Sequence, residues 1–156
     1  MSEAERRSPK YTGGCQCGTI RFAFFGEPIR ISLCHCRMCQ RAVSSPFAIL
    51  AESKYDDFAW TKGEPATFLS SSRAKRDFCG DCGSPLSYRV IDGDVIELLV
   101  CAFDDPAALA PHYAVGVESK LPWTDELHRL TSRTTGENAG ADFESSIENY
   151  QSKPYE

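Results

Sequence analysis

The sequence lacks the long apolar segment that a membrane-spanning helix requires. No apolar run in it approaches the roughly 18 residues needed to cross a bilayer. Its first residues, MSEAERRSPKY, also lack the apolar stretch of a secretion signal. These two absences lead us to expect a cytoplasmic protein that does not contact a membrane.

The sequence also lacks an excess of basic residues, which general nucleic-acid binders carry on one face. Its formal net charge is −5, and residues 136–156 contribute −4 of that charge, so residues 1–135 carry only −1. We therefore expect no nucleic-acid partner. We expect residues 133–156 to form an acidic tail that is disordered or loosely attached.

Cysteine is too sparse here for a disulfide-stapled scaffold, with eight residues in a chain of 156. Disulfides are also rare in the reducing cytosol. Pairs separated by one or two residues close loops that are too short to stabilise a fold much. Metal ligation is the better explanation for thiols that lie so close together in the sequence.

Short segments rich in β-branched and aromatic residues predict a β-rich domain over residues 13–132, preceded by a polar lead-in over 1–12. We expect a hairpin formed by strands 19–26 and 29–34. Further strands are predicted over residues 46–52, 66–72, 75–79, 86–90, 95–103 and 112–118. An Asp-Gly turn at 91–94 predicts a second hairpin. Short helices are predicted over residues 37–45 and 104–110.

Seven of the eight cysteines fall into three short clusters. The clusters are Cys15 and Cys17; Cys34, Cys36 and Cys39; and Cys79 and Cys82. The remaining cysteine, Cys101, stands alone inside the apolar segment ELLVCAF. We predict that Cys101 is a core residue of a strand, because an isolated cysteine in such a segment usually behaves as a small hydrophobic residue.

The pair Cys79 and Cys82 has the flanking glycines that let a metal-binding turn fold back on itself. A structural zinc needs four ligands, and Cys15 and Cys17, in a glycine-bracketed turn of their own, can supply the other two. Four thiolates around Zn²⁺ leave two net negative charges. A nearby base such as Arg76 can offset part of that charge.

This division leaves Cys34, Cys36 and Cys39 for a second metal with one free position. Three protein ligands and an open position are typical of a reactive zinc rather than a structural one. Such a position can accept the thiol of a small molecule, whose pKa the metal lowers.

Other divisions of the thiols stay open at the level of sequence. The first two clusters can share ligands, and His35, Cys101 or His112 can supply a fourth ligand to the second metal. We expect His35 to point away from the sulfurs, because neighbours in an extended segment face opposite sides. We expect its ring to support the site through a hydrogen bond.

Four segments of the chain resemble one protein family. GGCQCGTIRF, CHCRMCQR, FCGDCGSPL and ESKLPW are similar to segments of the glutathione-dependent formaldehyde-activating enzymes, a family that also includes centromere protein V. The resemblance extends over roughly residues 11–130. It implies a mainly β fold whose antiparallel sheets form a zinc-bearing β-tent with short helices.

The resemblance also implies two zinc ions per chain. Their ligands would be Cys15, Cys17, Cys79 and Cys82 for a structural zinc, and Cys34, Cys36 and Cys39 for a catalytic zinc. The implied activity is the condensation of glutathione with formaldehyde to S-hydroxymethylglutathione, which is classed as a carbon–sulfur lyase reaction.

Three functions compete for this sequence. The first is an enzyme that binds glutathione or a similar thiol and adds it to formaldehyde or another small aldehyde. The second is a non-catalytic module that captures such a thiol. The third is a zinc-ribbon adaptor for nucleic acid, against which the near-neutral body argues. The sequence carries no signature of an oligomeric state.

Glutathione has two carboxylates, so a site that binds it needs cationic groups near the open metal position. The bases closest in sequence to the relevant cysteines are Arg37, Arg41, Arg73, Lys75 and Arg76.

Overall fold

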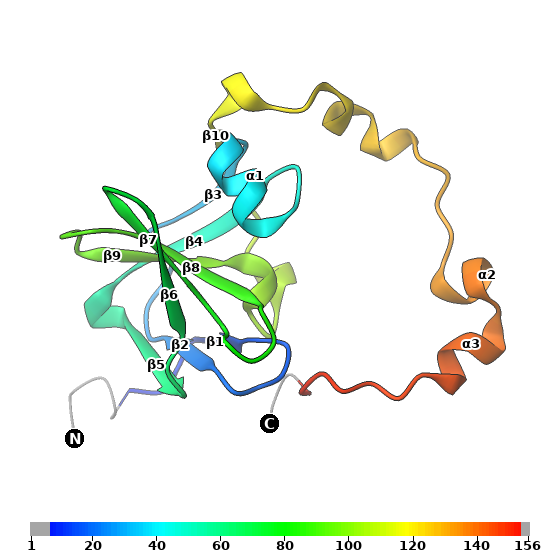
Figure 1. Ribbon diagram of the computed structural model, residues 1–156, viewed down its shortest axis with the longest axis horizontal. Coiled ribbons are helices and arrows are strands. Elements are labelled where there is room, and N and C mark those ends of the chain that lie inside the picture. The colour runs from blue at the N-terminus through cyan, green and yellow to red at the C-terminus, as the bar shows by residue number, and fades with distance from the viewer. Residues whose placement is uncertain (1–6, 154–156) are drawn as a thin grey trace.

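Residues 7–153, which a computed structural model describes, contain ten short strands in two sheets (Figure 1). The smaller sheet has the order β1-β2-β5 and is antiparallel throughout. Its strands are β1 (Tyr11–Gly14), β2 (Arg21–Phe24) and β5 (Phe58–Lys62).

The larger sheet has seven strands in the order β10-β3-β4-β9-β8-β7-β6. All its neighbours are antiparallel except β10 and β3, which run parallel. Its strands are β3 (Arg30–Cys34), β4 (Ala48–Lys54), β6 (Ala66–Ser71), β7 (Ala74–Phe78), β8 (Pro85–Val90), β9 (Val95–Leu99) and β10 (Tyr113–Val115).

The helices are short, as the sequence predicts. The α-helices are α1 (Arg37–Val43), α2 (Thr135–Ala139) and α3 (Ala141–Ser146). The 3₁₀ turns are η2 (Tyr55–Asp57), η3 (Val100–Ala102), η4 (Pro106–Ala108), η5 (Val117–Ser119) and η6 (Pro122–Arg129). Helix α1 and turn η4 confirm the two helical segments predicted from the sequence.

The principal core lies between the two sheets and is rich in aromatic residues. Phe22 and Phe24 of β2 pack edge-on against Phe103, with ring centroids 4.9 and 5.1 Å apart. Residues of the larger sheet, among them Ile96 and Leu98, complete the cluster. Burial of these side chains at roughly 1.5–3 kcal/mol each is the main force that holds the sheets together.

The predicted hairpin over residues 19–34 is wrong. Strand β2 pairs with β1 and β5 in the smaller sheet, whereas β3 pairs with β4 and β10 in the larger one. The periodicity of these segments identified them as strands but could not identify their partners. The tight turn around Cys15 and Cys17 brings β1 beside β2, so β2 finds its partner on the N-terminal side instead.

Strands β1 and β5 were not predicted from the sequence. Gly13 and Gly14 in β1 argue against a strand on propensity alone. The structure explains Gly13, because a Cβ there would lie 2.4 Å from the carbonyl oxygen of Ala102. The backbone bridge between Gly13 and Phe103 therefore requires a residue without a side chain.

The other predicted hairpins are confirmed. Strands β6 and β7 pair, and β8 and β9 pair around the Asp-Gly turn, where Asp92 has a φ of 64°. Strand β9 ends at Leu99, however, and Cys101 lies exposed in η3. The prediction that Cys101 is a core strand residue is therefore wrong, because the chain turns into a 3₁₀ helix before reaching it.

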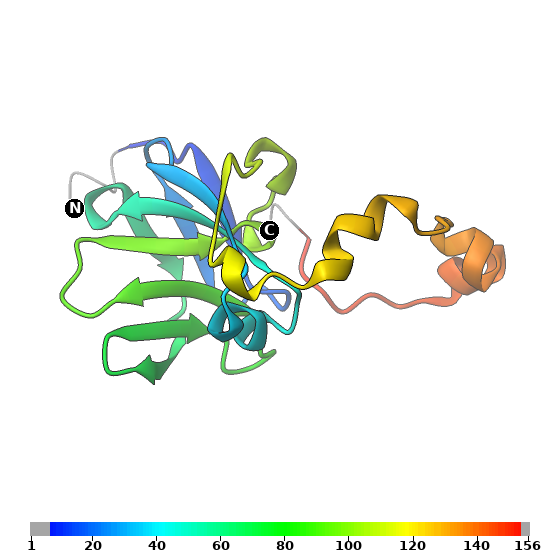
Figure 2. The same ribbon diagram turned by 90° about the horizontal axis from the view of Figure 1, so that it is seen from above.

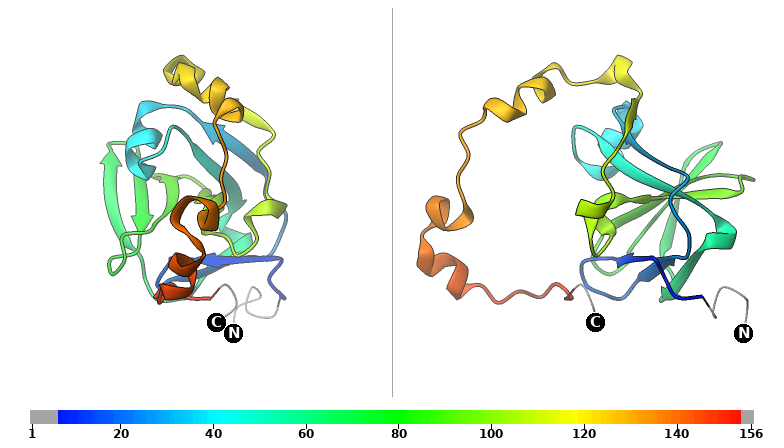
Figure 3. Two further views of the ribbon diagram at one scale, coloured as in Figure 1. Left: turned by 90° about the vertical axis from the view of Figure 1, so that its right-hand side faces the viewer. Right: turned by 180° about the vertical axis from the view of Figure 1, so that it is seen from behind.

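Residues 120–151 project away from the two sheets and contain η6, α2 and α3 (Figures 2 and 3). We call this segment the arm. Its residues are largely exposed. The chain then returns to the body, where the amide of Ser152 donates to the carbonyl oxygen of Gln16 at 2.7 Å. Within residues 7–153, no helix has the length and apolar character needed to cross a membrane.

A buried carboxylate ties three strands of the larger sheet together. Asp77 of β7 is 2% exposed and accepts hydrogen bonds from Thr67 and Ser87, each at 2.6 Å. Arg89 of β8 donates to both of its oxygens, at 2.9 and 3.0 Å. Burial alone would raise the pKa of Asp77, but these hydrogen bonds outweigh it and lower the pKa.

We expect Asp77→Ala to lower the free energy of unfolding by about 3 kcal/mol, because it leaves Arg89 and two hydroxyl groups without their acceptor. Chemical denaturation measures the change. Since the folded-state pKa is lowered, the contribution is present above about pH 3.9 and is lost as pH falls through that lowered pKa. The control Glu126→Ala removes an exposed ion pair and should cost under about 1 kcal/mol. Equal losses in the two variants would contradict the role assigned to Asp77.

Candidate metal centres

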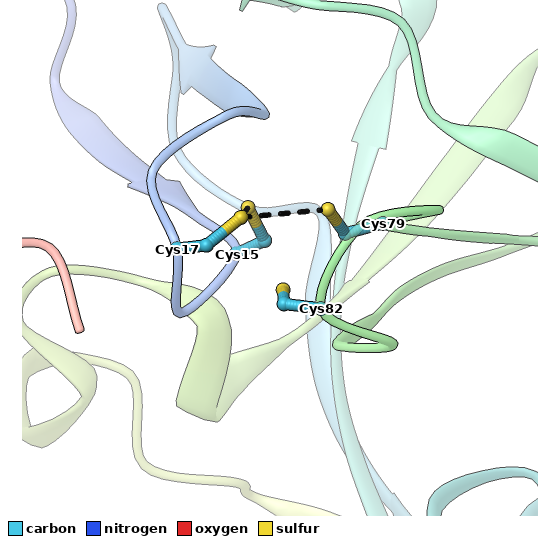
Figure 4. A group of neighbouring side chains, drawn as sticks. All are labelled: Cys15, Cys17, Cys79 and Cys82. Carbon is cyan, nitrogen blue, oxygen red and sulfur yellow. Dashed lines mark hydrogen bonds between the residues drawn. The ribbon is translucent and has the colours of Figure 1, made fainter. Parts of the chain in front are cut away.

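Four cysteines from two loops that are distant in the sequence come together (Figure 4). The sulfur atoms of Cys15, Cys17, Cys79 and Cys82 all lie within 4.8 Å of one another. Those of Cys15 and Cys17 are 3.5 Å apart, and those of Cys17 and Cys79 are 3.7 Å apart. Tetrahedral Zn–S bonds of about 2.3 Å place sulfurs about 3.8 Å apart, so the group has the dimensions of a zinc cage.

Glycines and backbone amides shape both loops. Gly18 and Gly83 have φ values of 77° and 75°, which allow the chain to turn back immediately after each cysteine pair. The amide of Ile20 donates to the sulfur of Cys15 at 3.3 Å. Gln16 joins the two loops, because its backbone amide donates to Ser84 and its side chain donates to the carbonyl oxygen of Cys82.

The thiols of this group differ in their readiness to ionise. Burial opposes ionisation of Cys82, but hydrogen bonds from Ser84 and from the backbone outweigh it and lower the pKa to about 6. The hydrogen bond with Thr19 lowers the pKa of Cys17. Burial raises the pKa of Cys79 to about 12. A bound cation is what allows all four to serve as thiolates together, and the residues present fit a structural zinc.

The second group is built where β3 runs into α1. Cys34 ends β3, Cys36 is the N-terminal cap of α1, and Cys39 lies one turn into the helix. The three sulfurs lie within 4.8 Å of one another. Cys34 and Cys39 are buried, whereas Cys36 is half-buried. The amide of Cys39 donates to the sulfur of Cys36 at 3.4 Å, so the start of the helix positions both thiols.

Among residues 7–153, no fourth cysteine, histidine or carboxylate joins this group. His35 is buried with its ring edge-on to Phe47, and its Nδ1 has no hydrogen-bond partner in the described part of the chain. Within the described residues, Nδ1 therefore does not supply the hydrogen bond to the site that the sequence led us to expect. Cys101 and His112 also lie outside the group, and the first two cysteine clusters share no ligands.

The three thiols of the second group are crowded together, and their surroundings shift their pKa values in different directions. Burial raises the pKa of Cys34 to about 12 and raises that of Cys39 as well. For Cys36, burial is outweighed by hydrogen bonds from backbone amides and neighbouring thiols, so its pKa is lowered. Buried thiols of this kind ionise together only beside a cation. The donor set fits zinc, which takes thiolates readily.

Arg76 supports the second group rather than the first. Its Nη2 lies 3.4 Å from the sulfur of Cys39, and its guanidinium carbon lies 4.9 Å from the ring centroid of Tyr88. Sequence proximity to Cys79 had suggested that Arg76 would offset the charge of the four-cysteine group. That expectation is wrong, because the guanidinium of Arg76 contacts Cys39, whereas Cys79 lies beyond the end of β7 and after the register shift at Asp77 and Phe78.

Two residues that the sequence did not single out brace the second group. The side-chain amide of Gln40 donates to the carbonyl oxygens of His35 and Ser119, at 2.8 and 3.0 Å. Gly116 has a φ of 64° and lies directly against Cys36, so that a Cβ there would be 2.7 Å from the Cys36 amide nitrogen. The segment after β10 is thereby fastened over the start of α1.

A cavity of about 560 Å³ lies beside the second group. Met38, Phe68 and Leu99 contribute apolar wall, and Arg41 and Arg76 contribute positive charge. Of the bases considered from the sequence, these two line the cavity, whereas Arg37 lies near Gln40, its Nη1 being 3.4 Å from the side-chain oxygen. A second cavity, of about 450 Å³, borders the four-cysteine group and is lined in part by Cys15, Cys101 and Ser152.

The chain thus combines a two-sheet β fold with one group of four thiols and one group of three thiols, and each group could hold a metal ion. The family model described as glutathione-dependent formaldehyde-activating enzyme matches residues 10–119. The chain belongs to this family, and the resemblance noted in the sequence is confirmed.

Two other proteins are similar to this chain. The chain is 32% identical over 85 residues to a protein of Schizosaccharomyces pombe named as an uncharacterized lyase, a match that covers 54% of this chain and 61% of that relative. The match therefore spans less than two thirds of the relative's length. A crystal structure of a Rhodobacter sphaeroides protein shares the fold, with a TM-score of 0.54 and 20% identity over 67% of this chain and 99% of that one.

We expect Gly116→Ala to weaken metal binding at the second group by about 10–100-fold, because the added Cβ displaces Cys36. Metal release to a chromogenic chelator measures the effect. The Gly116→Ala protein should release one metal faster than wild type does and should release the other at the wild-type rate. The control Gly136→Ala has room, since its nearest new contact is 3.7 Å away in the arm. Identical release curves for the two variants would show that Gly116 does not position Cys36.

Proposed function

We propose that this protein is a zinc-dependent enzyme of the carbon–sulfur lyase type. It binds glutathione or a similar thiol at Cys34, Cys36 and Cys39 and adds that thiol to formaldehyde or another small aldehyde. The observation that carries the proposal is the group of three close thiols to which the described residues supply no fourth ligand. Membership of the formaldehyde-activating family supports the same reaction class.

In this proposal the two thiol groups have different roles. The four-cysteine group holds a structural zinc, because its ligands come from two loops whose nearest members, Cys17 and Cys79, are 62 positions apart in the sequence. Gln16 joins the two loops through its hydrogen bonds to Ser84 and Cys82.

The three-cysteine group holds the second zinc, which when bound supplies an open position where an incoming thiol loses its proton near neutral pH. The chain carries two zincs in all.

The residues around the second group suit a negatively charged thiol. Three thiolates and a divalent cation leave one negative charge, and a fourth thiolate adds another. Arg76, in contact with Cys39, offsets part of that charge. Arg41 and Arg76 line the adjoining cavity, where they can pair with carboxylates of a peptide thiol such as glutathione.

The exposure of the three cysteines indicates the side from which a small molecule can approach the group. Cys34 and Cys39 are buried, so the half-buried Cys36 marks the side from which a small molecule reaches the group. The thiols must stay reduced to serve as ligands, and this requirement agrees with a cytoplasmic location. No nucleic acid takes part in this proposal.

We expect Cys36→Ser to lose one of the two zincs while the protein stays folded, because the four-cysteine group does not depend on α1. Elemental analysis gives the metal content, and circular dichroism reports the fold. Loss of both metals with unfolding would mean that the second group is structural. The matched control is Cys101→Ser, which removes an exposed thiol outside both groups and should retain two zincs.

Turnover separates the enzyme from a thiol-binding module. Exchange NMR can follow formation of S-hydroxymethylglutathione from glutathione and formaldehyde with wild type, Cys36→Ser and Cys101→Ser. We expect acceleration above the spontaneous rate with wild type and Cys101→Ser, and none with Cys36→Ser. Saturable glutathione binding with only the spontaneous rate would instead identify a carrier.

A further inference from the structure

The cavities of about 560 and 450 Å³ adjoin each other beside the three-cysteine group. Three residues, Val43, Pro85 and Leu99, line both of them. Val43 and Leu99 also pack against the buried cluster that contains Cys34 and Cys39. The two cavities therefore meet at side chains that contact the three-cysteine group, and each then extends over a different part of the molecule.

The 450 Å³ cavity lies close to two of the three cysteines. Ala48 lines this cavity, and the antiparallel register places it directly opposite Cys34, so that their Cβ atoms are about 4.5–5.5 Å apart. Val43 follows Cys39 by four positions on α1, a spacing that puts both side chains on one face of the helix. A ligand in this cavity is therefore separated from these two cysteines by single side chains.

Most of the wall of the 450 Å³ cavity is apolar. Phe47, Ile49 and Phe103 contribute large side chains to it, and we call it the apolar cavity. Within the described part of the chain, the charged residues in its lining are Arg21 and Asp104. They neutralise each other, because Arg21 Nη1 donates to Asp104 Oδ1 at 2.9 Å and both side chains are largely buried. The cavity therefore suits a neutral, apolar group rather than an ion.

The 560 Å³ cavity differs from the apolar cavity in charge. Arg41 and Arg76 line it, and Nη2 of Arg76 lies 3.4 Å from the sulfur of Cys39. In the proposed function this cavity takes the thiol, whose carboxylates pair with the two arginines. The apolar cavity is then the space left for the second reactant, the aldehyde.

The size of the apolar cavity indicates the class of aldehyde. Ligand pockets typically measure about 300–1,000 Å³, so a cavity of about 450 Å³ is large enough for a small organic molecule. Formaldehyde has only two heavy atoms, and a single water already takes about 30 Å³. Formaldehyde would thus leave most of the cavity to solvent. An aldehyde with a hydrocarbon chain of several carbons would displace that solvent and bury its own apolar surface.

Resting on the proposed function, we propose that the apolar cavity binds the hydrocarbon substituent of a neutral aldehyde, so that the protein adds its thiol to alkyl or aryl aldehydes larger than formaldehyde. The aldehyde carbon lies beside Val43 and Leu99, where the two cavities meet, and its substituent extends past Ala48 toward Phe103. In the reaction the S–H bond and the carbonyl π bond break, while a C–S and an O–H bond form. The addition needs neither an oxidant nor a reductant.

A series of unbranched aldehydes tests the apolar cavity through turnover. Propanal, butanal, pentanal and hexanal share the same carbonyl chemistry and differ only in apolar length. We expect kcat/KM with glutathione, divided by the spontaneous rate constant for each aldehyde, to rise by up to about fourfold per methylene. Exchange NMR measures both rates. Turnover that does not rise along the series would overturn the role of the cavity and leave the proposed function intact.

A variant that fills the apolar cavity gives a matched comparison. Ser45 is half-buried and lines the apolar cavity but not the 560 Å³ cavity. Ser45→Phe adds a bulky ring to the lining, so the ratio of kcat/KM for hexanal to that for propanal should fall by about tenfold or more. The control Ser72→Phe makes the same change at an exposed residue that lines neither cavity and should keep the wild-type ratio. A wild-type ratio in Ser45→Phe would contradict the placement of the substituent.

Cys101 reports occupancy of the apolar cavity without turnover, because it is an exposed thiol at the edge of that cavity. Peptide mass spectrometry can follow its alkylation by iodoacetamide in the presence of hexan-1-ol, a neutral analogue that does not react. Saturating hexan-1-ol should slow the alkylation of Cys101 by about fivefold in wild type and in Ser72→Phe, but not in Ser45→Phe. Propan-1-ol at the same concentration should slow it less.

The alkylation and turnover measurements together separate the apolar cavity from the proposed function. Unchanged alkylation of Cys101 in wild type overturns the binding of an apolar group, even if the protein turns over formaldehyde. Slowed alkylation without turnover of any aldehyde retains the apolar site but rejects both the lyase and the role of the aldehyde. Absence of both effects rejects the apolar site and the lyase together.

Discussion

The contact on which the rest of the structure depends is the meeting of the two cysteine loops. One loop closes the β1–β2 hairpin, and the other joins β7 to β8, so their contact fixes the smaller sheet against the larger one. Four thiols packed within 4.8 Å would repel as thiolates without a cation. The aromatic core between the sheets and this thiol group therefore support each other, since each requires the sheet spacing that the other maintains.

The second thiol group is positioned by these rigidly held sheets but takes no part in the contact between the two cysteine loops. Its cysteines lie at the junction of β3 and α1, and the segment after β10 is fastened over them by Gln40 and Gly116. Strand β10 is parallel to β3, so it brings that segment to the same end of the sheet as Cys34. A thiol group built in this way rests on a scaffold that the group itself does not have to hold together.

The sequence was sufficient for the features that local spacing encodes. Tight cysteine pairs predicted which thiols gather, and short alternating segments predicted most strands and the β-rich fold. The sequence was insufficient for features that depend on which distant segments pair with each other, such as the partner of each strand. Strand β2 has the composition of a hairpin partner for β3, yet the turn at Cys15 pairs it with β1, and its other neighbour is the distant β5.

The same limit applies to individual side chains. Arg76 appeared to belong with Cys79 because the two are close in sequence, but its guanidinium contacts Cys39. Gly13 and Gly116 carry no signal of their roles in the sequence, because the backbone that crowds each of them comes from a distant segment.

The attachment of the arm at both ends has a consequence for how the chain can vary. Ser119 is held by Gln40 at one end, and Ser152 is held by Gln16 at the other, so the intervening residues form a closed loop. The entropy of closing a flexible loop grows only with the logarithm of its length, at about 0.6 kcal/mol per doubling. Insertions there are thermodynamically cheap, so this segment can change in length and composition while both thiol groups keep their geometry.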